Sequence, residues 1–505
     1  MNARYRDMLL VLSLFYALTS SAQPSTLHPA LDIAAIDRFV AQQMAAQRLP
    51  GLALAITHGD QVLYVKGYGT ADDGQPVTPQ TQFMIASLSK SFTALAIMQL
   101  VEQSKIDLDA PVRTYLPEFA LADAGAAARI TVRQLLNHTS GLSDRGFPPM
   151  RQPQPTSPAE RVASMRTAHP VAAPGTEFHY FDVNYQVLAR VVERVSNQAF
   201  SDYMEAHVFA PLQMAQTFAA NTAPEAQQRA SRLAQGHIVV FGIPVAATEL
   251  PYYFGGSGGV ISTAEDLAHY LIMQNNGGRF QGTRLLSPEG VALMHTPPPN
   301  VASSYAMGWS ATTEDGVRVL EHNGILSAFS AEAALLPDSG YGLVLLTNAH
   351  ALAADAVALP QLKRGLLALL MGRQPLDAGW SVGRLGLIGG GITLLGVALA
   401  LRSLLGLPRW RRKAATTPLW RLLPGIGWAF VPGMAVLSLP WLVAVSSDRV
   451  FDTASLFRSM PELYIWLGSC GVLGALNGVA RIVMLARPAR SPQVEGSPAP
   501  GIAQR

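Results

Sequence analysis

Cysteine is almost absent from this 505-residue sequence: it has one, Cys470, which rules out an intramolecular disulfide. Packing must therefore supply the stability, and with 49% hydrophobic residues the chain can build two or more folding units. Charged residues are few, at 14%, and a net charge of +3 is too small to indicate nucleic-acid binding. His138 has no second histidine at metal-ligand spacing, so we interpret it as a structural hydrogen-bonder and expect no metal or cofactor.

The N-terminus has the features of an export signal. Arg4 and Arg6 precede an apolar run over residues 8–18, and the small residues that follow offer a cleavage site before Gln23. We therefore predict a signal peptide over residues 1–22. An uncleaved membrane anchor is the alternative, although the apolar run is shorter than the ~20 residues that a spanning helix needs.

Three long apolar runs follow near the C-terminus, at residues 385–407, 422–445 and 463–485. Each is long enough, at about 1.5 Å per residue, to cross a hydrocarbon core of ~30 Å, and three such runs are hard to place in a soluble core. A transporter or channel is disfavoured, because only Arg481 and Asn477 are strongly polar candidates inside the spans.

The charges between the spans predict the orientation. The first joint, residues 408–421, carries five basic residues and no acid, which places it in the cytoplasm. The second joint, residues 446–462, has no positive excess and is expected outside. We thus predict an exported domain over residues 23–375, a three-span region over 383–487 in a bacterial inner membrane, and a disordered cytoplasmic tail over 488–505.

The stretch at residues 83–100, FMIASLSKSFTALAIMQL, contains the motif S-x-x-K at Ser87 and Lys90. Apolar residues recur after it at helical spacing, which predicts that Ser87 opens a buried helix with Lys90 on the same face. Burial disfavours an ammonium ion, and an uncharged lysine can accept a proton from the Ser87 hydroxyl. Ser87 is therefore the predicted nucleophile. The alternative for the four-residue motif S-x-x-K is a serine that caps the helix, followed by a solvated lysine.

Strand-like runs lie near both ends of the exported segment. Residues 52–57 and 62–67 predict a hairpin after an amphipathic helix over 31–48. Four more predicted strands precede a closing helix over 351–371, and they lie at 306–312, 317–320, 331–336 and 343–347.

Three further segments carry polar or glycine-rich patterns. Tyr180 precedes a helix that we predict up to residue 195, and a tyrosine hydroxyl can serve as a second acid/base beside cations, whereas a half-buried aromatic is the plain alternative. The run GGSGGVISTAEDLAHYL at 255–271 lacks a phosphate-loop lysine, so it predicts close packing before a helix capped by Ser262 and Glu265. The proline-rich residues 146–158 predict a loop at a pocket rim.

Together these motifs resemble the beta-lactamase-related serine hydrolases, which include class C beta-lactamases, low-molecular-weight penicillin-binding proteins, D-aminopeptidases and carboxylesterases. The resemblance covers residues 31–370 because the motifs come in the family's order, namely Ser87-Leu88-Ser89-Lys90, LLNHTSGL at 135–142, Tyr180-Phe181-Asp182, GGVISTAEDL at 258–267 and His322-Asn323-Gly324. It implies an α/β fold of the α+β type, beta-lactamase/transpeptidase-like, with an antiparallel sheet built from both chain ends around an inserted helical region.

The resemblance also implies roles for individual residues. Ser87 is acylated, Lys90 and Tyr180 handle protons, and the backbone N–H groups of Ser87 and Ile325 form the oxyanion hole. The substrate-binding residues carried over from the family are Asp182, His322, Asn323 and Gly324.

Two departures from the family pattern bear on the substrate. Asp182 stands where the family has an amide and accepts hydrogen bonds only, while His322 stands where penicillin-recognising relatives have lysine. Both weaken a beta-lactamase assignment and leave acyl transfer intact. We expect a membrane-anchored serine hydrolase acting on ester or amide substrates, small molecules or cell-wall peptides. D-Ala-D-Ala carboxypeptidase, D-aminopeptidase, beta-lactamase and a non-turnover cell-wall sensor or scaffold remain alternatives, and the oligomeric state stays open.

Overall fold

The computed structural model describes residues 31–486, apart from 73, 315, 353 and 377–378. The predicted signal peptide and cytoplasmic tail lie outside the described residues. A seven-stranded antiparallel sheet, in the order β11-β12-β13-β14-β1-β2-β3, forms the centre of the N-terminal domain. Its strands are β1 Gly51–His58, β2 Gln61–Asp72, β3 Gln75–Pro76, β11 Ser310–Glu314, β12 Val317–Ile325, β13 Ser330–Leu336 and β14 Tyr341–Thr347.

The sheet joins the two ends of the domain. Strand β1 pairs with β14 from Leu52 opposite Thr347 to His58 opposite Tyr341, so the predicted N-terminal hairpin and the later strands form one sheet. The structure thereby confirms the predicted architecture. Strand β12 runs on through Ile325, five residues beyond its predicted end, and β11 begins four residues later than predicted.

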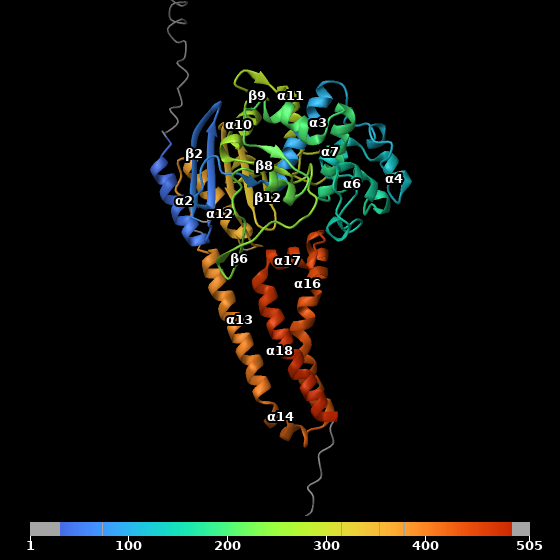
Figure 1. Ribbon diagram of the computed structural model, residues 1–505, viewed down its shortest axis with the longest axis vertical. Coiled ribbons are helices and arrows are strands. Elements are labelled where there is room, and N and C mark those ends of the chain that lie inside the picture. Colours follow the sequence, from blue (N-terminus) through green and yellow to red (C-terminus); the bar gives the residue numbers. More distant parts are fainter. Residues whose placement is uncertain (1–30, 73, 315, 353, 377–378, 487–505) are drawn as a thin grey trace, which may run out of the picture.

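Helices cover both faces of the sheet, which explains why β1 is buried almost along its whole length. Leu52, Leu54 and Ile56 belong to the core under α2 (Ile33–Gln47) and α12 (Leu359–Leu370). The alternate residues Ala53 and Ala55 belong to the larger core, which includes α10 (Ala264–Asn275) and α3 (Ser89–Glu102). In Figure 1 this sheet stands between α2 and α10.

A helical region is inserted between β3 and β11, on the side of the domain opposite α2 (Figure 1). Its main helices after α3 are α4 Ala124–Arg129, α5 Val132–Leu136, α6 Pro158–Ser164, α7 Asp182–Ser196, α8 Phe200–Met204 and α9 Ala223–Arg229. The proline-rich loop holds only a short 3-10 turn, Pro149–Arg151. A small three-stranded sheet, β4-β8-β5, links this region to the site through β4 Phe83–Met84, β8 Val260–Ser262 and β5 Phe218–Ala219.

One local prediction is wrong. Ser262 does not cap α10, because it ends strand β8 with its side chain buried against Thr217. Thr263 is the cap, and its hydroxyl accepts a hydrogen bond from the backbone N–H of Asp266. Pairing of β8 with β4 and β5 keeps Ser262 extended, and this moves the helix start by one residue.

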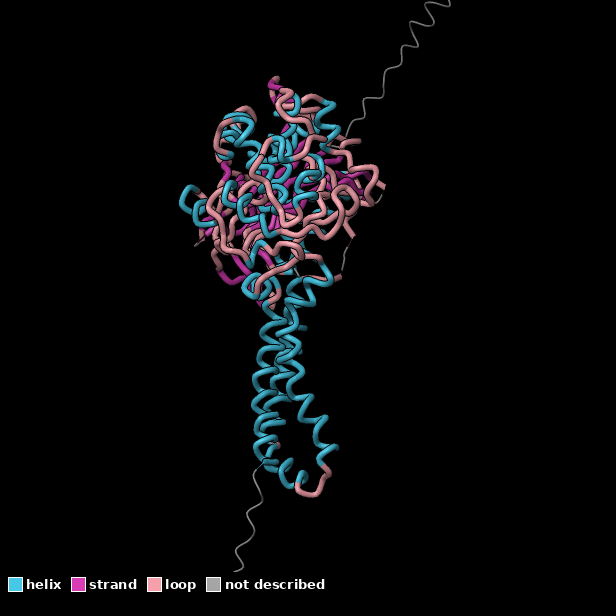
Figure 2. The backbone as a smooth tube through the Cα atoms, turned by 90° about the vertical axis from the view of Figure 1, so that its right-hand side faces the viewer, coloured by secondary structure: helices cyan, strands magenta, loops and turns pink. Residues whose placement is uncertain are grey.

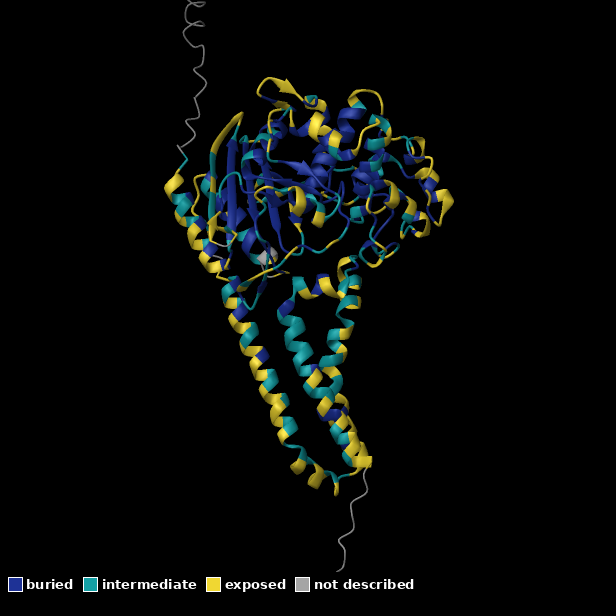
Figure 3. Ribbon diagram, in the orientation of Figure 1, coloured by how far each residue is buried: buried dark blue, intermediate teal, exposed yellow. Residues whose placement is uncertain are grey.

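Three C-terminal helical segments are long and apolar enough to cross a membrane: Val382–Leu405 (α13), Leu419–Ser447 (α15 and α16) and Pro461–Ala486 (α18). In the most apolar 18 residues of each segment, only 11%, 6% and 22% of the residues, respectively, are buried in the protein. Most of the apolar surface therefore faces outward, as in helices that contact lipid. They project from the domain as a stalk (Figures 2 and 3). A short helix, α17 (Thr453–Ser459), lies between the second and third segments, directly under the domain (Figure 1).

Candidate active site

The turn that carries Ser87 is strained. Ala86, Ser87 and Leu88 form a 3-10 turn that continues into α3, and Ala86 has a φ of 51°, in the left-handed region that side chains with a Cβ seldom adopt. Such backbone strain is concentrated at functional sites, where the surrounding structure maintains it. Here the turn holds Ser87 at the surface of a pocket while Leu88 and Lys90 point into the core.

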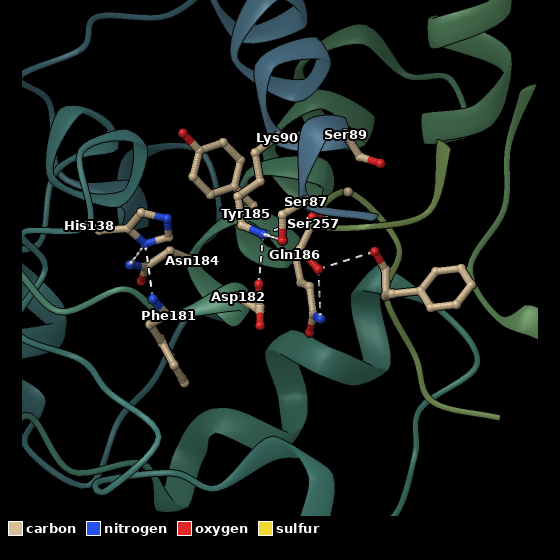
Figure 4. A network of polar contacts seen from close by, with 12 residues as sticks. Ser87, Ser89, Lys90, His138, Phe181, Asp182, Asn184, Tyr185, Gln186 and Ser257 are labelled. Atoms are coloured by element: carbon tan, nitrogen blue, oxygen red, sulfur yellow. Dashed lines mark hydrogen bonds and ion pairs between the residues drawn. The ribbon is translucent and has the colours of Figure 1, made fainter. Parts of the chain in front are cut away.

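Lys90 lies beside Ser87, one turn along, as the motif spacing predicts. Its side chain is fully buried, and Nζ lies 2.9 Å from Ser87 Oγ, 2.7 Å from Asp182 Oδ1 and 2.9 Å from the carbonyl oxygen of Ser257 (Figure 4). The alternative of a solvated lysine is therefore wrong. A carboxylate and a carbonyl can only accept, so a neutral amine can donate to both and still accept a proton from the serine hydroxyl.

Asp182 begins helix α7 and is held there by a buried histidine. His138 Nδ1 accepts hydrogen bonds from the backbone N–H of Phe181 (3.1 Å) and from Asn184 Nδ2 (3.2 Å) (Figure 4). Burial lowers the pKa of His138 well below its ordinary value, so the ring stays neutral and can accept. His138 is thus a structural hydrogen-bonder, in line with its interpretation from the sequence.

The Asp182 carboxylate contacts two cations. Lys90 binds one oxygen, and Nη2 of Arg449 donates to the other at 2.6 Å. Burial works to raise the pKa of the Asp182 carboxyl, but the charges of Lys90 and Arg449 outweigh it and hold that pKa well below its usual range. Asp182 is therefore ionised, and its carboxylate is engaged by Lys90 and Arg449.

Strand β12 brings the His322-Asn323-Gly324 segment to the nucleophile turn. Gly324 packs so closely that an added Cβ would lie 2.1 Å from the carbonyl oxygen of Ile85. Asn323 is exposed, and Asn323 and Ile325 line the same pocket as Ser87. This arrangement brings the backbone of Ile325 to the pocket wall where the sequence predicts the second oxyanion-hole donor.

His322 is buried beside this pocket and does not line it. Its Nδ1 donates to the carbonyl oxygen of Asn323 at 2.6 Å, which leaves Nε2 to accept from the Tyr305 hydroxyl at 3.0 Å. Burial, with the nearby charge of Lys90, lowers the pKa of His322 to about 4, so the ring is neutral at pH 7. His322 lines an adjoining hollow of about 420 Å³, which Tyr180 and Asn323 share.

The Tyr180 ring lies close to both Lys90 and Arg449. Its ring centre is 4.9 Å from Lys90 Nζ and 5.3 Å from the Arg449 guanidinium. The ring also lies beside His138, at 4.5 Å between centroids. Tyr180 thus stands close to the proposed base, on the wall of the pocket.

The pocket at Ser87 has a volume of about 410 Å³ and is walled mainly by apolar side chains. Pro149 and Met150 come from the predicted rim loop, and Tyr252, Phe254 and Phe451 complete much of the wall. Across the described ranges, no group of three or more His, Cys, Asp and Glu side chains could hold a metal ion.

Sequence reasoning missed Arg449 and Phe451 as site residues, because both belong to the joint between the second and third spans. In the sequence, Arg449 counted only toward the charge balance of residues 446–462, which predicts the orientation of the apolar helices. The available signal was Asp182 itself. An acid at a position where relatives carry a neutral amide needs a second cation if it is buried beside Lys90.

Comparisons with known proteins agree with this geometry. The family model described as Beta-lactamase matches residues 36–368. Penicillin-binding protein 4 of Amycolatopsis lactamdurans is 31% identical over 313 residues, which cover 59% of this chain and 81% of that protein. Protein flp of Staphylococcus aureus (strain MW2) is 29% identical over 325 residues, and the match spans 62% of each chain.

A solved structure supports the same fold. The octameric penicillin-binding protein homologue from Pyrococcus abyssi has a TM-score of 0.58 and 27% identity, with 68% of this chain and 78% of that chain covered. The family model covers well over half of the 505 residues and includes every motif named above except Arg449 and Phe451. The chain therefore belongs to the beta-lactamase family, the beta-lactamase-fold serine hydrolases and penicillin-binding proteins.

Proposed function

We propose that this protein is a membrane-anchored serine hydrolase that cleaves esters or amides through an acyl-enzyme on Ser87. The observation that carries the proposal is the 2.9 Å contact between Ser87 Oγ and the fully buried Lys90 Nζ at the pocket wall. A buried amine that touches a hydroxyl at this distance is the arrangement that activates a serine nucleophile.

The proposed reaction has two stages. Ser87 Oγ attacks the carbonyl carbon of the substrate while its proton passes to the Lys90 amine, which must first have given up its own proton, and the N–H groups of Ser87 and Ile325 stabilise the oxyanion. As the oxyanion collapses, the bond from the carbonyl carbon to the leaving oxygen or nitrogen breaks, and that atom takes up the proton with Tyr180 as the second proton carrier, which leaves the acyl group as an ester on Ser87. Water, deprotonated by the same groups, attacks the ester on Ser87, so that the acid is released and the serine regains its proton.

The environment of His322 favours neutral substrates. A lysine at this position would present a permanent cation to a substrate carboxylate, whereas His322 is buried and neutral at pH 7. Charge-assisted hydrogen bonds are roughly twice as strong as neutral ones, so a carboxylate-bearing substrate loses more than a neutral one. The apolar pocket wall likewise suits an apolar acyl group.

The charges of the joints support a proposed orientation in which the domain lies outside the cytoplasmic membrane of a bacterium and the C-terminus lies inside. The three apolar helices support an anchor by their length and composition. The boundaries of residues 23–375 and 383–487 are part of the same proposal.

The decisive experiment labels full-length protein in detergent with a fluorophosphonate probe and, in parallel, with a fluorescent penicillin. We expect strong fluorophosphonate labelling that Ser87→Ala abolishes. Ser201→Ala, which removes a hydroxyl that does not line the pocket, should leave it unchanged. Labelling of Ser87→Ala at the wild-type level would refute the assignment.

Turnover separates an enzyme from a ligand sensor. Pre-steady-state kinetics with a nitrophenyl ester should give continued product release after the first equivalent. One stoichiometric burst without turnover would favour the sensor, and exclusive reaction with D-amino-acid amides would favour the peptidase branch of the family.

A further inference from the structure

The joint between the second and third spans docks onto the catalytic domain beside the pocket. Asp448 pairs with Arg145 and lies 2.6 Å from His179 Nδ1, and the backbone N–H of Val450 donates to Asp144 at 3.1 Å. Further contacts along the joint are Asp452 with the Tyr252 hydroxyl, Arg458 with Ser327 and the Thr248 carbonyl, and Ser459 with His350. So many polar contacts make the joint an integral part of this face of the domain.

Arg449 is the residue of this joint that reaches the catalytic groups. Its Nε donates to Asp144 at 2.9 Å and its Nη2 donates to Asp182 at 2.6 Å. The guanidinium lies over the Tyr180 ring and forms part of the wall of the Ser87 pocket. A side chain from the joint is thus linked to Ser87 by three contacts, Arg449 to Asp182, Asp182 to Lys90 and Lys90 to Ser87.

We propose that Arg449 is a positioning residue of the hydrolase, which shares the Asp182 carboxylate with Lys90 so that Lys90 can give up its proton and act as the base. This inference rests on the proposed function. It makes the membrane region a part of the active site, in addition to its role as an anchor.

The charge balance explains why such a residue is needed. Polar and aromatic groups face Lys90 from every element packed around it. They are Asp182 and Tyr185 from α7, Tyr180 from the turn before α7, His138 from its own turn, His322 from β12 and, through Asp182, Arg449 from the joint. Burial keeps His138 and His322 neutral by lowering their pKa values. The ionised partners of Lys90 are therefore the Asp182 carboxylate and the Arg449 guanidinium behind it.

An aspartate in this position would by itself hold Lys90 in its charged form. A neutral amide, which relatives have there, imposes no such constraint. Arg449 offsets the carboxylate charge, and Asp182 and Asp144 in turn raise the pKa of Arg449 above its usual range although burial opposes them, so the arginine stays charged. Arg449 therefore weakens the pull of the Asp182 carboxylate on Lys90. Arg449 also binds Asp144, the second acid of this cluster, whose carboxyl pKa burial raises toward the neutral form.

The test measures acylation of full-length protein in detergent as a function of pH, with a short-chain nitrophenyl ester as substrate. Loss of Arg449 leaves Asp182 to Lys90 alone, so the lysine keeps its proton to higher pH. In Arg449→Ala we expect the acid limb of the kcat/KM profile to move to higher pH by about one unit or more, a tenfold or larger fall in rate at a fixed pH on that limb.

The double variant Arg449→Ala/Asp182→Asn provides the rescue. It removes the carboxylate together with the arginine, so its acid limb should return toward the wild-type position even if its maximal rate is lower. Arg458→Ala is the matched control, because it removes the same charge from the same joint without touching Asp182. Its acid limb should stay at the wild-type position.

Three outcomes would overturn the inference: an unshifted acid limb in Arg449→Ala, an equal shift in Arg458→Ala, or a shift that the Asp182→Asn substitution does not reverse. If Arg449→Ala does not fold, Arg449→Gln removes the charge but keeps a hydrogen-bond donor for Asp182, and the pH dependence of labelling in Arg449→Gln and in Arg449→Gln/Asp182→Asn gives the same comparison. Failure of the proposed function gives a different result, namely wild-type protein without Ser87-dependent hydrolysis or labelling.

Discussion

Gly324 lies against Ile85 so closely that a Cβ at residue 324 would stand 2.1 Å from the Ile85 carbonyl oxygen and 3.1 Å from the Ala86 Cβ. Strand β12 can therefore approach the strained turn before Ser87 only because residue 324 has no side chain. This contact joins the two backbone segments that carry the predicted oxyanion-hole donors, Ser87 and Ile325.

Gly324→Ala should consequently reduce acylation. The added methyl group pushes β12 from the turn, and a displaced oxyanion-hole donor costs about 10²-fold in kcat. We expect that loss in ester hydrolysis by full-length protein, with a moderate fall in melting temperature from overpacking. Gly391→Ala is the control, since a Cβ there meets nothing within 4 Å. Equal rates for the two variants would contradict the role of the contact.

Lys90→Met should remove the base and leave the nucleophile in place. General-base assistance contributes about 10²- to 10⁴-fold, so the rate of fluorophosphonate labelling of Ser87 should fall by that range. Lys66→Met removes a lysine that pairs with Asp37 on the domain surface, and it should label like the wild type. A labelling rate in Lys90→Met within threefold or so of wild type would exclude Lys90 as activator.

The lack of a permanent cation at residue 322 should favour neutral over carboxylate-bearing substrates, although the His322 ring itself lies beside the Ser87 pocket and not in its wall. The wild type should hydrolyse a short-chain nitrophenyl ester with kcat/KM far above that for nitrocefin. In His322→Lys the ratio should narrow, because the new cation attracts the nitrocefin carboxylate. Faster turnover of nitrocefin than of the ester by the wild type would show the argument to be wrong.

The ionisation of His322 should not appear in the pH profile near neutrality. Its pKa is lowered to about 4, from an ordinary 6.5, so the ring is already neutral above about pH 5 and loses no proton between pH 5 and 8. We therefore expect His322→Asn to leave the position of the acid limb unchanged over that range, whatever its effect on the maximal rate. A limb that moves by half a unit or more in His322→Asn would assign the titration to this ring.

A phosphatase reporter that is active only outside the cytoplasm tests the orientation. Fused to the C-terminus, it should be inactive, because the basic joint at residues 408–421 places that end inside. Fused after the exposed Leu376, before the first span, the same reporter should be active. Activity at the C-terminus would require a different number or direction of spans.

Much of the molecule was determined by the sequence alone. Ser87 lies in the 3-10 turn that continues into α3 and Lys90 lies in the first turn of α3, so a spacing of three residues along this helical path places them side by side. The N-terminal hairpin and the three apolar helices likewise follow from local periodicity and length. The order of the family's motifs then implied the antiparallel sheet from both chain ends.

Only the tertiary structure decided which distant groups complete the site. Arg449 and Asp182 are 267 residues apart in sequence and meet because the joint docks on the face where α7 begins. The start of α10 depended in the same way on strand pairing at Ser262. Local pattern determines what each element is, but contacts between elements depend on how the whole chain packs. Here that packing brings an arginine between two apolar helices to the same carboxylate as the catalytic lysine candidate.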